Sequence, residues 1–204
     1  MRLHYSATSP YVRKVRVLLA EAGRTDDVAL VQAAGTPLDS GGMPLAQNPL
    51  GKIPTLERDD GPALFDSRVI CRFLDAEFGT NLYPPAPALW SVLTIEALAD
   101  GITDAAIAMV YETRLRSEAQ VNAQLLEGYW EKITRALGAL ETRWMADLAR
   151  TKPDMAQIAV GTALGYLDFR HQDRPWRSNA PNLGAWYAVF SARPSMLATV
   201  PPDR

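Results

Sequence analysis

The sequence predicts a two-domain protein in which an α/β domain is followed by an all-helical domain. Up to about residue 78, short strand-like runs alternate with helical runs, and glycine or proline marks each change. After the proline-rich run TNLYPPAP, strand patterns nearly vanish and apolar residues recur with helical spacing. We therefore expect an α/β domain over residues 1–79, a linker over 80–87 and an all-helical domain over 88–204.

Local patterning places the elements of the first domain. Serine followed by proline at Ser9-Pro10 is typical of a helix start, and Gly23 and Gly79 are typical of helix ends. The run DDGP at residues 59–62 is a turn signal between two strands. In order, we expect a strand at 2–6, a helix at 10–22, strands at 28–31, 55–58 and 63–65, and a helix at 67–78.

The second domain has the pattern of packed amphipathic helices. An apolar stripe with spacings of mostly four and three predicts one long helix that carries Leu126, Trp130, Ile133, Leu137, Leu140, Trp144 and Leu148. Another helix is expected to begin at Asp154, which forms a D-x-x-Q variant of the capping box with Gln157. Gly161 and Gly165 would let a neighbouring helix approach this one closely, and a last short helix is expected over 183–190.

Composition and charge argue against several classes of function. The 204 residues include 23 acidic and 21 basic ones, with a formal charge of −2 and no long block of like charge. We therefore expect neither a nucleic-acid partner nor an acidic membrane partner. The single cysteine, Cys71, excludes an intramolecular disulfide and a CxxC redox site, and two histidines cannot form a clustered zinc site. No metal is expected.

The sequence favours a cytoplasmic location. Its N-terminus lacks the basic-then-apolar run of a signal peptide, and cysteine usage fits a reducing compartment. The most apolar later stretch, Trp90 to Tyr111, is interrupted by Glu96, Asp100 and Asp104, so we expect no segment that spans a bilayer.

The run NPLGKIPTL at residues 48–56 is the most informative stretch of the chain. It places Pro54 directly before an expected strand, and a cis Ile53-Pro54 bond would leave the Ile53 N–H and C=O free at an edge. A free edge can pair with an extended peptide. Across the next turn, Asp66-Ser67 begins a helix and would offer backbone N–H groups, a hydroxyl and the positive end of the helix dipole to a carboxylate. Together these features describe a receptor for a small acidic peptide.

These stretches, taken together, resemble a known family. TSPYVRKVR, NPLGKIPTL and FDSRVICRFLD, followed by a proline-rich linker and a helical half that contains EALADGITDA, YLDFR and RPS, look like a bacterial cytosolic glutathione S-transferase. The resemblance covers the whole chain. It implies a thioredoxin-like N-terminal domain, an all-α C-terminal domain and glutathione as cosubstrate. It also implies a homodimer that pairs through the Ser67 to Phe78 helix and the helix containing Asp100.

The resemblance gives Ser9 a catalytic role, because its position matches the serine that donates a hydrogen bond to the glutathione sulfur. A thiol with a pKa of about 8.5 is only a few per cent ionised at pH 7, and lowering that pKa by about two requires roughly 2.7 kcal/mol. A hydroxyl hydrogen bond of about 1.5–3 kcal/mol plus a helix-dipole contribution of about 0.3–1 kcal/mol supplies this. Tyr5 is the alternative donor, since some branches use a tyrosine at the end of the first strand; its structural interpretation is an aromatic side chain on the sheet.

Other residues acquire ligand roles through the same resemblance. Ile53, Pro54, Asp66 and Ser67 are expected to bind glutathione, with turn and cap chemistry as the alternative. Lys52 would meet the glycyl carboxylate or remain an exposed loop lysine. Asp100 and Asp104, four positions apart on one helix face, would reach the γ-glutamyl ammonium across a dimer interface, or be solvated charges.

A small hydrophobic electrophile is the expected second substrate. Met109, Val110, Tyr111 and Arg114 are candidates to border its pocket in the helical domain, with core packing as the alternative for the apolar ones. Cys71 lies among apolar residues of an expected helix and is interpreted as an inert core residue. Conversely, the basic residues Arg13, Lys14 and Arg16 are expected on the solvated face of the first helix.

The expected function is therefore glutathione transfer in detoxification, with conjugation, peroxidase and isomerase activities left open. The alternative is a non-catalytic binding or regulatory protein on the same fold. Thiol-disulfide chemistry is disfavoured, because the first loop lacks the cysteine that such enzymes need.

Overall fold

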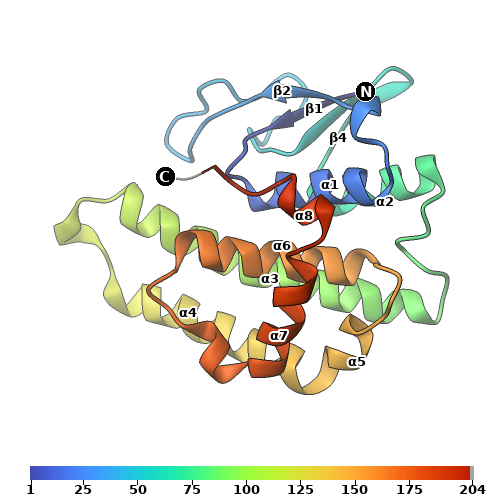
Figure 1. Ribbon diagram of the computed structural model, residues 1–204. Coiled ribbons are helices and arrows are strands. Elements are labelled where there is room, and N and C mark those ends of the chain that lie inside the picture. Colours follow the sequence, from blue (N-terminus) through green and yellow to red (C-terminus); the bar gives the residue numbers. More distant parts are fainter. Residues whose placement is uncertain (203–204) are drawn as a thin grey trace. The chain divides into compact units, whose positions relative to one another are not determined.

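The computed structural model describes residues 1–202 and divides the chain into two compact units (Figure 1). The first unit comprises residues 1–83 and the segment that begins at Pro194, and the second comprises Pro84–Arg193. The first unit is α/β and the second is all helical, and the pair of units has the glutathione S-transferase architecture that the resemblance implied. The helical unit ends at Arg193, before the expected boundary at residue 204.

A mixed four-stranded sheet forms the centre of the first unit. Its strands are β1 (Arg2–Tyr5), β2 (Ala29–Gln32), β3 (Thr55–Arg58) and β4 (Gly61–Phe65), in the spatial order β2-β1-β3-β4. Strand β1 runs parallel to β2 and antiparallel to β3, and β3 runs antiparallel to β4. Leu3 and Leu56 face each other across β1 and β3 and are fully buried, so the apolar positions of these strands form one core.

Two helices of the first unit carry the ends that matter for the site. Helix α1 (Pro10–Glu21) begins at the N-cap residue Ser9, and α2 (Ser67–Phe78) begins at the N-cap residue Asp66. Gly79 ends α2 in the left-handed conformation, with φ of 61°, as its position in the sequence predicts. A short 3₁₀ turn at Thr25–Asp27 leads from α1 to β2.

The expectation that Arg13 and Lys14 are solvated is wrong, because both side chains are buried. The chain returns to the first unit through α8 (Pro194–Leu197), which packs against α1. There the Arg13 Nη2 donates to the Met196 carbonyl at 3.1 Å, so a segment distant in sequence covers this side chain. Arg16 remains partly exposed, with its guanidinium 5.8 Å from the centroid of the Tyr5 ring.

The start of the expected linker is held against α2. The Asp75 carboxylate accepts hydrogen bonds from the Thr80 hydroxyl and from the backbone N–H groups of Leu82 at 2.7 Å and Tyr83 at 3.2 Å. The guanidinium of Arg72 lies 4.7 Å from the Tyr83 ring centroid. Residues 80–83 therefore belong structurally to the first unit.

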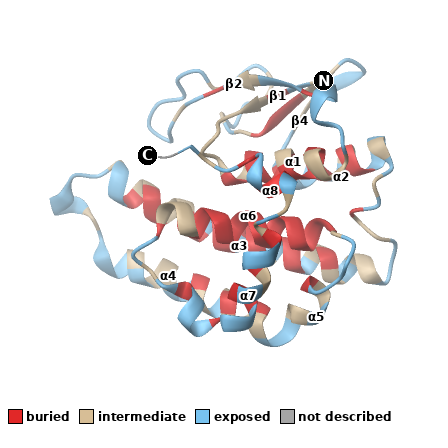
Figure 2. Cartoon of the chain, in the orientation of Figure 1, coloured by how far each residue is buried: buried red, intermediate tan, exposed pale blue. Residues whose placement is uncertain are grey.

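The second unit is built around the long helix α3 (Ala88–Arg114), which packs against α6 (Met155–Arg170). Helix α6 is buried continuously from Met155 to Leu167 (Figure 2), as expected for a helix that is apolar on all sides. The other elements are a 3₁₀ turn at Glu118–Gln120, α4 (Ala123–Ala139), a π-helical segment at Leu140–Trp144, α5 (Met145–Leu148), a 3₁₀ turn at Trp176–Asn179 and α7 (Pro181–Phe190). Among residues 1–202, no helix has the length and apolarity needed to cross a membrane.

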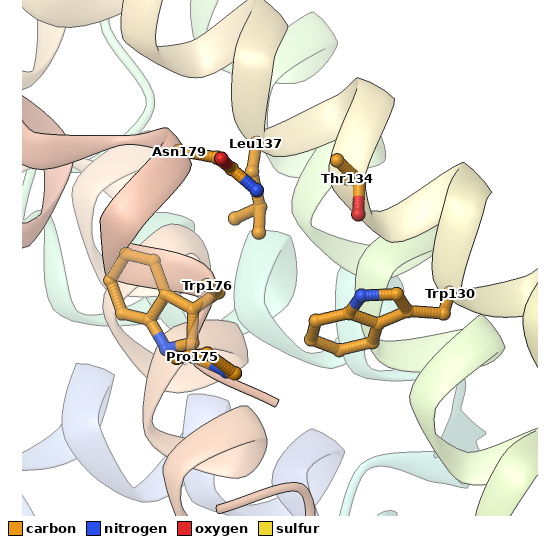
Figure 3. A pocket seen from close by; sticks show the side chains of 6 residues that line it. All are labelled: Trp130, Thr134, Leu137, Pro175, Trp176 and Asn179. Carbon is orange, nitrogen blue, oxygen red and sulfur yellow. The ribbon is translucent and has the colours of Figure 1, made fainter. Parts of the chain in front are cut away.

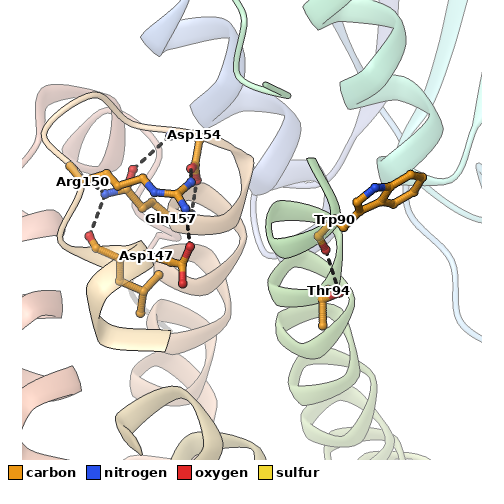
Figure 4. Close-up of polar contacts among 7 residues, drawn as sticks. Trp90, Thr94, Asp147, Arg150, Asp154 and Gln157 are labelled. Atoms are coloured by element: carbon orange, nitrogen blue, oxygen red, sulfur yellow. Dashed lines mark hydrogen bonds and ion pairs between the residues drawn. The ribbon is translucent and has the colours of Figure 1, made fainter. Parts of the chain in front are cut away.

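The structure confirms the predicted capping box at the start of α6. The Gln157 N–H donates to the Asp154 carboxylate at 3.2 Å, and the Asp154 N–H donates to the Gln157 side-chain oxygen at 3.0 Å. Arg150 donates to both Asp147 and Asp154 beside this cap (Figure 4). The single long helix predicted from the apolar stripe is interrupted, because the π-helical turn separates α4 from α5.

Candidate functional site

The register of the sheet brings the three stretches singled out from the sequence to one end of the first unit. Thr55 is paired with His4 on one side and with Phe65 on the other. The loop to Ser9 follows β1, Ile53-Pro54 directly precedes β3, and Asp66-Ser67 directly follows β4. Because β3 is antiparallel to both neighbours, all three stretches leave the sheet at the same end.

Ser9 begins α1 as predicted, and its geometry leaves the hydroxyl proton available. The Val12 N–H donates to the Ser9 Oγ at 3.3 Å, and Ser9 has the extended backbone of an N-cap, with φ of −79° and ψ of 121°. The Oγ is therefore an acceptor within the protein, and Ser9 makes no hydrogen bond as a donor within residues 1–202. The cap contact orients the hydroxyl oxygen at the positive end of α1 while its proton can point to a ligand.

The loop before β3 exposes a peptide edge. The Ile53-Pro54 bond is cis, as the proline at the head of a strand predicts. Within residues 1–202, neither the N–H nor the C=O of Ile53 makes a hydrogen bond. The loop is held from behind by Asn48, which is 1% exposed and whose amide donates to the Lys52 carbonyl at 2.9 Å. The Thr55 hydroxyl donates to the same carbonyl at 2.9 Å.

The start of α2 presents donors without internal acceptors. Asp66 has φ of 70° and caps the helix by accepting from the Arg68 N–H at 2.8 Å. Ser67 is 5% exposed, and its hydroxyl makes no hydrogen bond within the described chain, residues 1–202. The first N–H groups of a helix also lack intrahelical partners, so Ser67 offers an N–H and an O–H in a field that favours an anion.

The negative charge of Asp66 is balanced by neighbouring cations. The Arg68 Nη2 lies 3.0 Å from the Asp66 Oδ2, and this side-chain hydrogen bond is the main reason that the pKa of Asp66 is lowered from its ordinary value. The positive charge of Lys14 contributes in the same direction. Asp66 is therefore ionised at neutral pH, but its charge does not oppose an anion at Ser67 as strongly as an unpaired carboxylate would. No local pattern in the sequence indicates these roles of Arg68, Lys14 and Asn48.

The remaining candidates of the first unit are Tyr5 and Lys52. Tyr5 ends β1, is partly buried under Arg16, and its hydroxyl makes no hydrogen bond within residues 1–202. Lys52 is exposed and forms no ion pair in the same described range. The structure therefore leaves both side chains available without assigning them a ligand.

Asp100 and Asp104 lie on α3, in the second unit. They share a helix face by their spacing, but Asp100 is 8% exposed whereas Asp104 is exposed. The two carboxylates therefore differ in environment, and solvation alone does not describe Asp100.

The candidate pocket residues lie near the C-terminal end of α3. Met109 and Val110 are buried, Tyr111 is partly buried and Arg114 is exposed. Tyr111 and Arg114 lie close enough to the buried Tyr166 of α6 to influence its pKa, which burial raises above the ordinary value. The sequence indicates no individual role for Tyr166, although it begins the YLDFR run, because a tyrosine in an apolar helix has no distinguishing local signal.

A four-stranded mixed sheet with an unpaired peptide edge, joined to an all-helical unit, defines the glutathione S-transferase class of protein. Family models support this assignment over both units: the glutathione S-transferase N-terminal domain matches residues 8–77 and the C-terminal domain matches residues 123–188. The chain belongs to the glutathione S-transferase family.

Similar proteins cover the whole chain. An uncharacterised GST-like protein of Escherichia coli K12, YibF, is 36% identical over 99% of both chains. A glutathione transferase family member from Pseudomonas fluorescens Pf-5, solved with bound glutathione, is 48% identical over 98% of both chains, with a TM-score of 0.95. The same Pseudomonas family member has also been solved with S-(propanoic acid)-glutathione, with 99% of this chain covered, 100% of that chain and a TM-score of 0.91.

Proposed function

We propose that this protein is a glutathione transferase that joins glutathione to a small hydrophobic electrophile. The observation that carries the proposal is the row His4–Thr55–Phe65, which places Ser9, the Ile53 edge and the Ser67 donors at one end of the sheet. Support also comes from the glutathione bound to the Pseudomonas relative.

Each part of glutathione has a chemical counterpart among the residues at this end of the sheet. The cysteinyl backbone would pair antiparallel with Ile53, whose N–H and C=O lack partners within residues 1–202. The γ-glutamyl carboxylate would accept from the N–H and hydroxyl of Ser67, and Asp66 would attract the ammonium. The ammonium of Lys52 would meet the glycyl carboxylate.

Ser9 would activate the thiol without ionising itself. Its hydroxyl donates to the sulfur and stabilises the thiolate, and the proton released from the thiol leaves to solvent. The thiolate then attacks the electrophilic carbon, a C–S bond forms, and the electron pair of the broken bond leaves with the displaced group. Holding both reactants in one site adds the rate advantage of proximity.

The proposal extends to the setting in which the reaction takes place. The active form would be a homodimer in the cytoplasm, and Asp100 and Asp104 would complete the partner's glutathione site. Met109, Val110, Tyr111 and Arg114 would border the electrophile, and detoxification would be the physiological role.

The proposed role of Ser9 is tested by titrating the ultraviolet absorbance of bound glutathione thiolate against pH. Ser9→Ala should raise the titration midpoint by about one to two pH units, because one hydrogen bond to an anion is lost. The same variant should lose about 1 kcal/mol of stability through the missing cap.

Two variants separate the cap from the donor. Ser9→Asp keeps a good cap but replaces the donor with a negative charge, so stability should hold while the thiol pKa rises further. Tyr5→Phe should change neither property. If instead Tyr5→Phe raises the thiol pKa and Ser9→Ala does not, Ser9 is only a helix cap. If glutathione binds but neither substitution affects its ionisation, the protein is a glutathione-binding protein without this catalytic device.

A further inference from the structure

A cavity lies within the helical unit, and its lining includes none of the residues of the candidate site. Its volume is about 100 Å³, and its lining comes from α4 and from the turn at residues 175–179, namely Trp130, Thr134, Leu137, Pro175, Trp176 and Asn179. Figure 3 shows Trp130 and Trp176 on opposite sides of the cavity. Trp130 and Leu137 belong to the apolar stripe predicted for this helix, and both side chains line the cavity.

The wall formed by Trp176 is held in place. Trp176 is 3% exposed, and its Nε1 donates to the Asp168 Oδ1 at 2.9 Å. Arg177 donates to both oxygens of the same carboxylate, at 2.7 Å and 2.6 Å. The Trp176 indole is therefore preorganised, which reduces the entropy that a ligand must overcome.

Charges around the cavity are balanced. The guanidinium of Arg174 lies 5.1 Å from the Trp130 ring centroid, and that of Arg177 lies 4.3 Å from the Trp176 ring centroid. Arg174 is paired with Glu127 at 2.6 Å, as Arg177 is with Asp168. Each of these two guanidiniums is neutralised by its carboxylate, so a charged ligand of either sign would lose hydration without gaining an unpaired counter-charge from them. The cavity therefore favours a neutral ligand.

The polar groups at the cavity are available for a ligand. Within residues 1–202, the Trp130 Nε1, the Thr134 hydroxyl and the Asn179 amide make no hydrogen bond. The indole N–H can only donate, whereas the hydroxyl and the amide can each donate and accept. One ligand hydroxyl that both donates and accepts would match this set.

We infer that the cavity binds a small neutral aromatic molecule that carries a hydroxyl group, with a single phenol-type ring between Trp130 and Trp176. An engineered apolar cavity of about 150 Å³ binds benzene, and a water molecule occupies about 30 Å³. The cavity of about 100 Å³ is larger than one water molecule but smaller than that engineered cavity. A single ring would therefore project towards the exposed lining residues Pro175 and Asn179 and would not be fully enclosed. The indole rings favour an aromatic ligand over a saturated one through offset-stacked or edge-to-face contacts.

The test uses phenol as the probe and the indole N–H resonances of ¹⁵N-labelled full-length protein as the readout. We expect the Trp130 and Trp176 resonances to shift saturably, with a dissociation constant on the order of 1 mM for a ligand of this size. Cyclohexanol should bind about three- to tenfold more weakly, because it lacks the ring quadrupole. Benzoate and benzylammonium should also bind more weakly than phenol.

Two conservative variants localise the site. Trp130→Phe keeps a ring but removes the N–H, and Thr134→Val keeps the shape but removes the hydroxyl; each should weaken phenol binding about two- to tenfold. The matched control is Trp90→Phe, whose parent side chain is 63% exposed on α3, and it should leave binding unchanged. Melting curves establish that the variants are folded.

The inference is overturned if phenol produces no saturable shift in the wild-type protein. It is equally overturned if cyclohexanol binds as tightly as phenol, or if folded Trp130→Phe and Thr134→Val bind like the Trp90→Phe control.

Discussion

Asp154 is both the N-cap residue of α6 and a buried acidic residue, since it is only 6% exposed. Its backbone N–H and carboxylate are both used in the capping box with Gln157. Desolvation by burial is the main influence on its carboxyl group and raises the pKa of Asp154, although hydrogen bonds and the charge of Arg150 act in the opposite direction. The carboxylate therefore stabilises the helix start as a hydrogen-bond acceptor but costs stability as a charge.

We predict that Asp154→Ala lowers the free energy of unfolding by about 1–2 kcal/mol, because the N-cap acceptor is lost. Asp154→Asn should retain most of that stability, since asparagine is an equally good N-cap. Urea denaturation at fixed pH measures both differences. Equal losses for the two variants would show that the charge, and not the cap, stabilises this end of α6.

The pH dependence follows from the direction of the shift. A carboxyl group whose pKa is higher in the folded than in the unfolded protein contributes its stability fully below the unfolded value and loses it as pH rises through the folded value. The stability of Asp154→Asn relative to wild type should therefore increase as pH rises from the acidic range towards neutrality.

At the scale of elements, α7 depends on a carboxylate from another helix. Its N-cap residue is Ala180, whose side chain cannot accept a hydrogen bond. Glu141 replaces the missing cap: its Oε1 accepts from the Asn182 N–H at 3.0 Å, and its Oε2 accepts from the Leu183 N–H at 2.7 Å. Glu141 lies in the π-helical segment Leu140–Trp144, so the irregular turn presents the carboxylate to the positive end of α7.

We predict that Glu141→Ala destabilises the protein by about 1–2 kcal/mol and loosens α7 locally, because two N–H groups lose their acceptor. Hydrogen exchange should accelerate at Asn182 and Leu183 beyond the change in global stability. The control is Glu131→Ala on α4, where an exposed glutamate is 3.8 Å from Arg135 and should contribute little. Unchanged exchange at α7 in Glu141→Ala would contradict this role.

The interruption of α4 shows what periodicity could not predict. The apolar stripe correctly identified the side that packs inward, since Ile133, Leu137, Leu140 and Leu148 are all buried. The π-helical turn carries Glu141, whose carboxylate accepts from the backbone N–H of Asn182, 41 positions later in the chain. No local pattern around Glu141 carries that information.

At the scale of the whole molecule, the proposed dimer has apolar side chains available on the first unit. Leu50, Phe65 and Val69 are 65%, 36% and 48% exposed, and Val69 lies on α2, the helix through which the family resemblance implies pairing. Exposed apolar residues of this size, when they gather on one face, are typical of a protein interface.

We predict that the wild-type protein is a dimer at micromolar concentration and that Val69→Glu shifts it to a monomer, because a buried unpaired charge opposes association. Light scattering measures the mass directly. Val189→Glu is the control, since Val189 is 77% exposed on α7 and should tolerate the charge without loss of the dimer. A wild-type monomer would leave Asp100 and Asp104 without their proposed cross-subunit role.

The sequence by itself determined the order of the elements, the caps at Ser9, Asp66 and Asp154, and the family, because these depend on local chemistry: short-range hydrogen bonds, helix-end preferences and glycine or proline conformations. Tertiary structure alone decided contacts between residues distant along the chain. The C-terminal segment covers Arg13, which a helical wheel places in solvent, and Glu141 caps α7. Likewise, the cavity between Trp130 and Trp176 exists because α4 and the turn at residues 175–179 leave space between the two indoles. Such contacts depend on how separate segments fold back on one another, which short-range patterning does not encode.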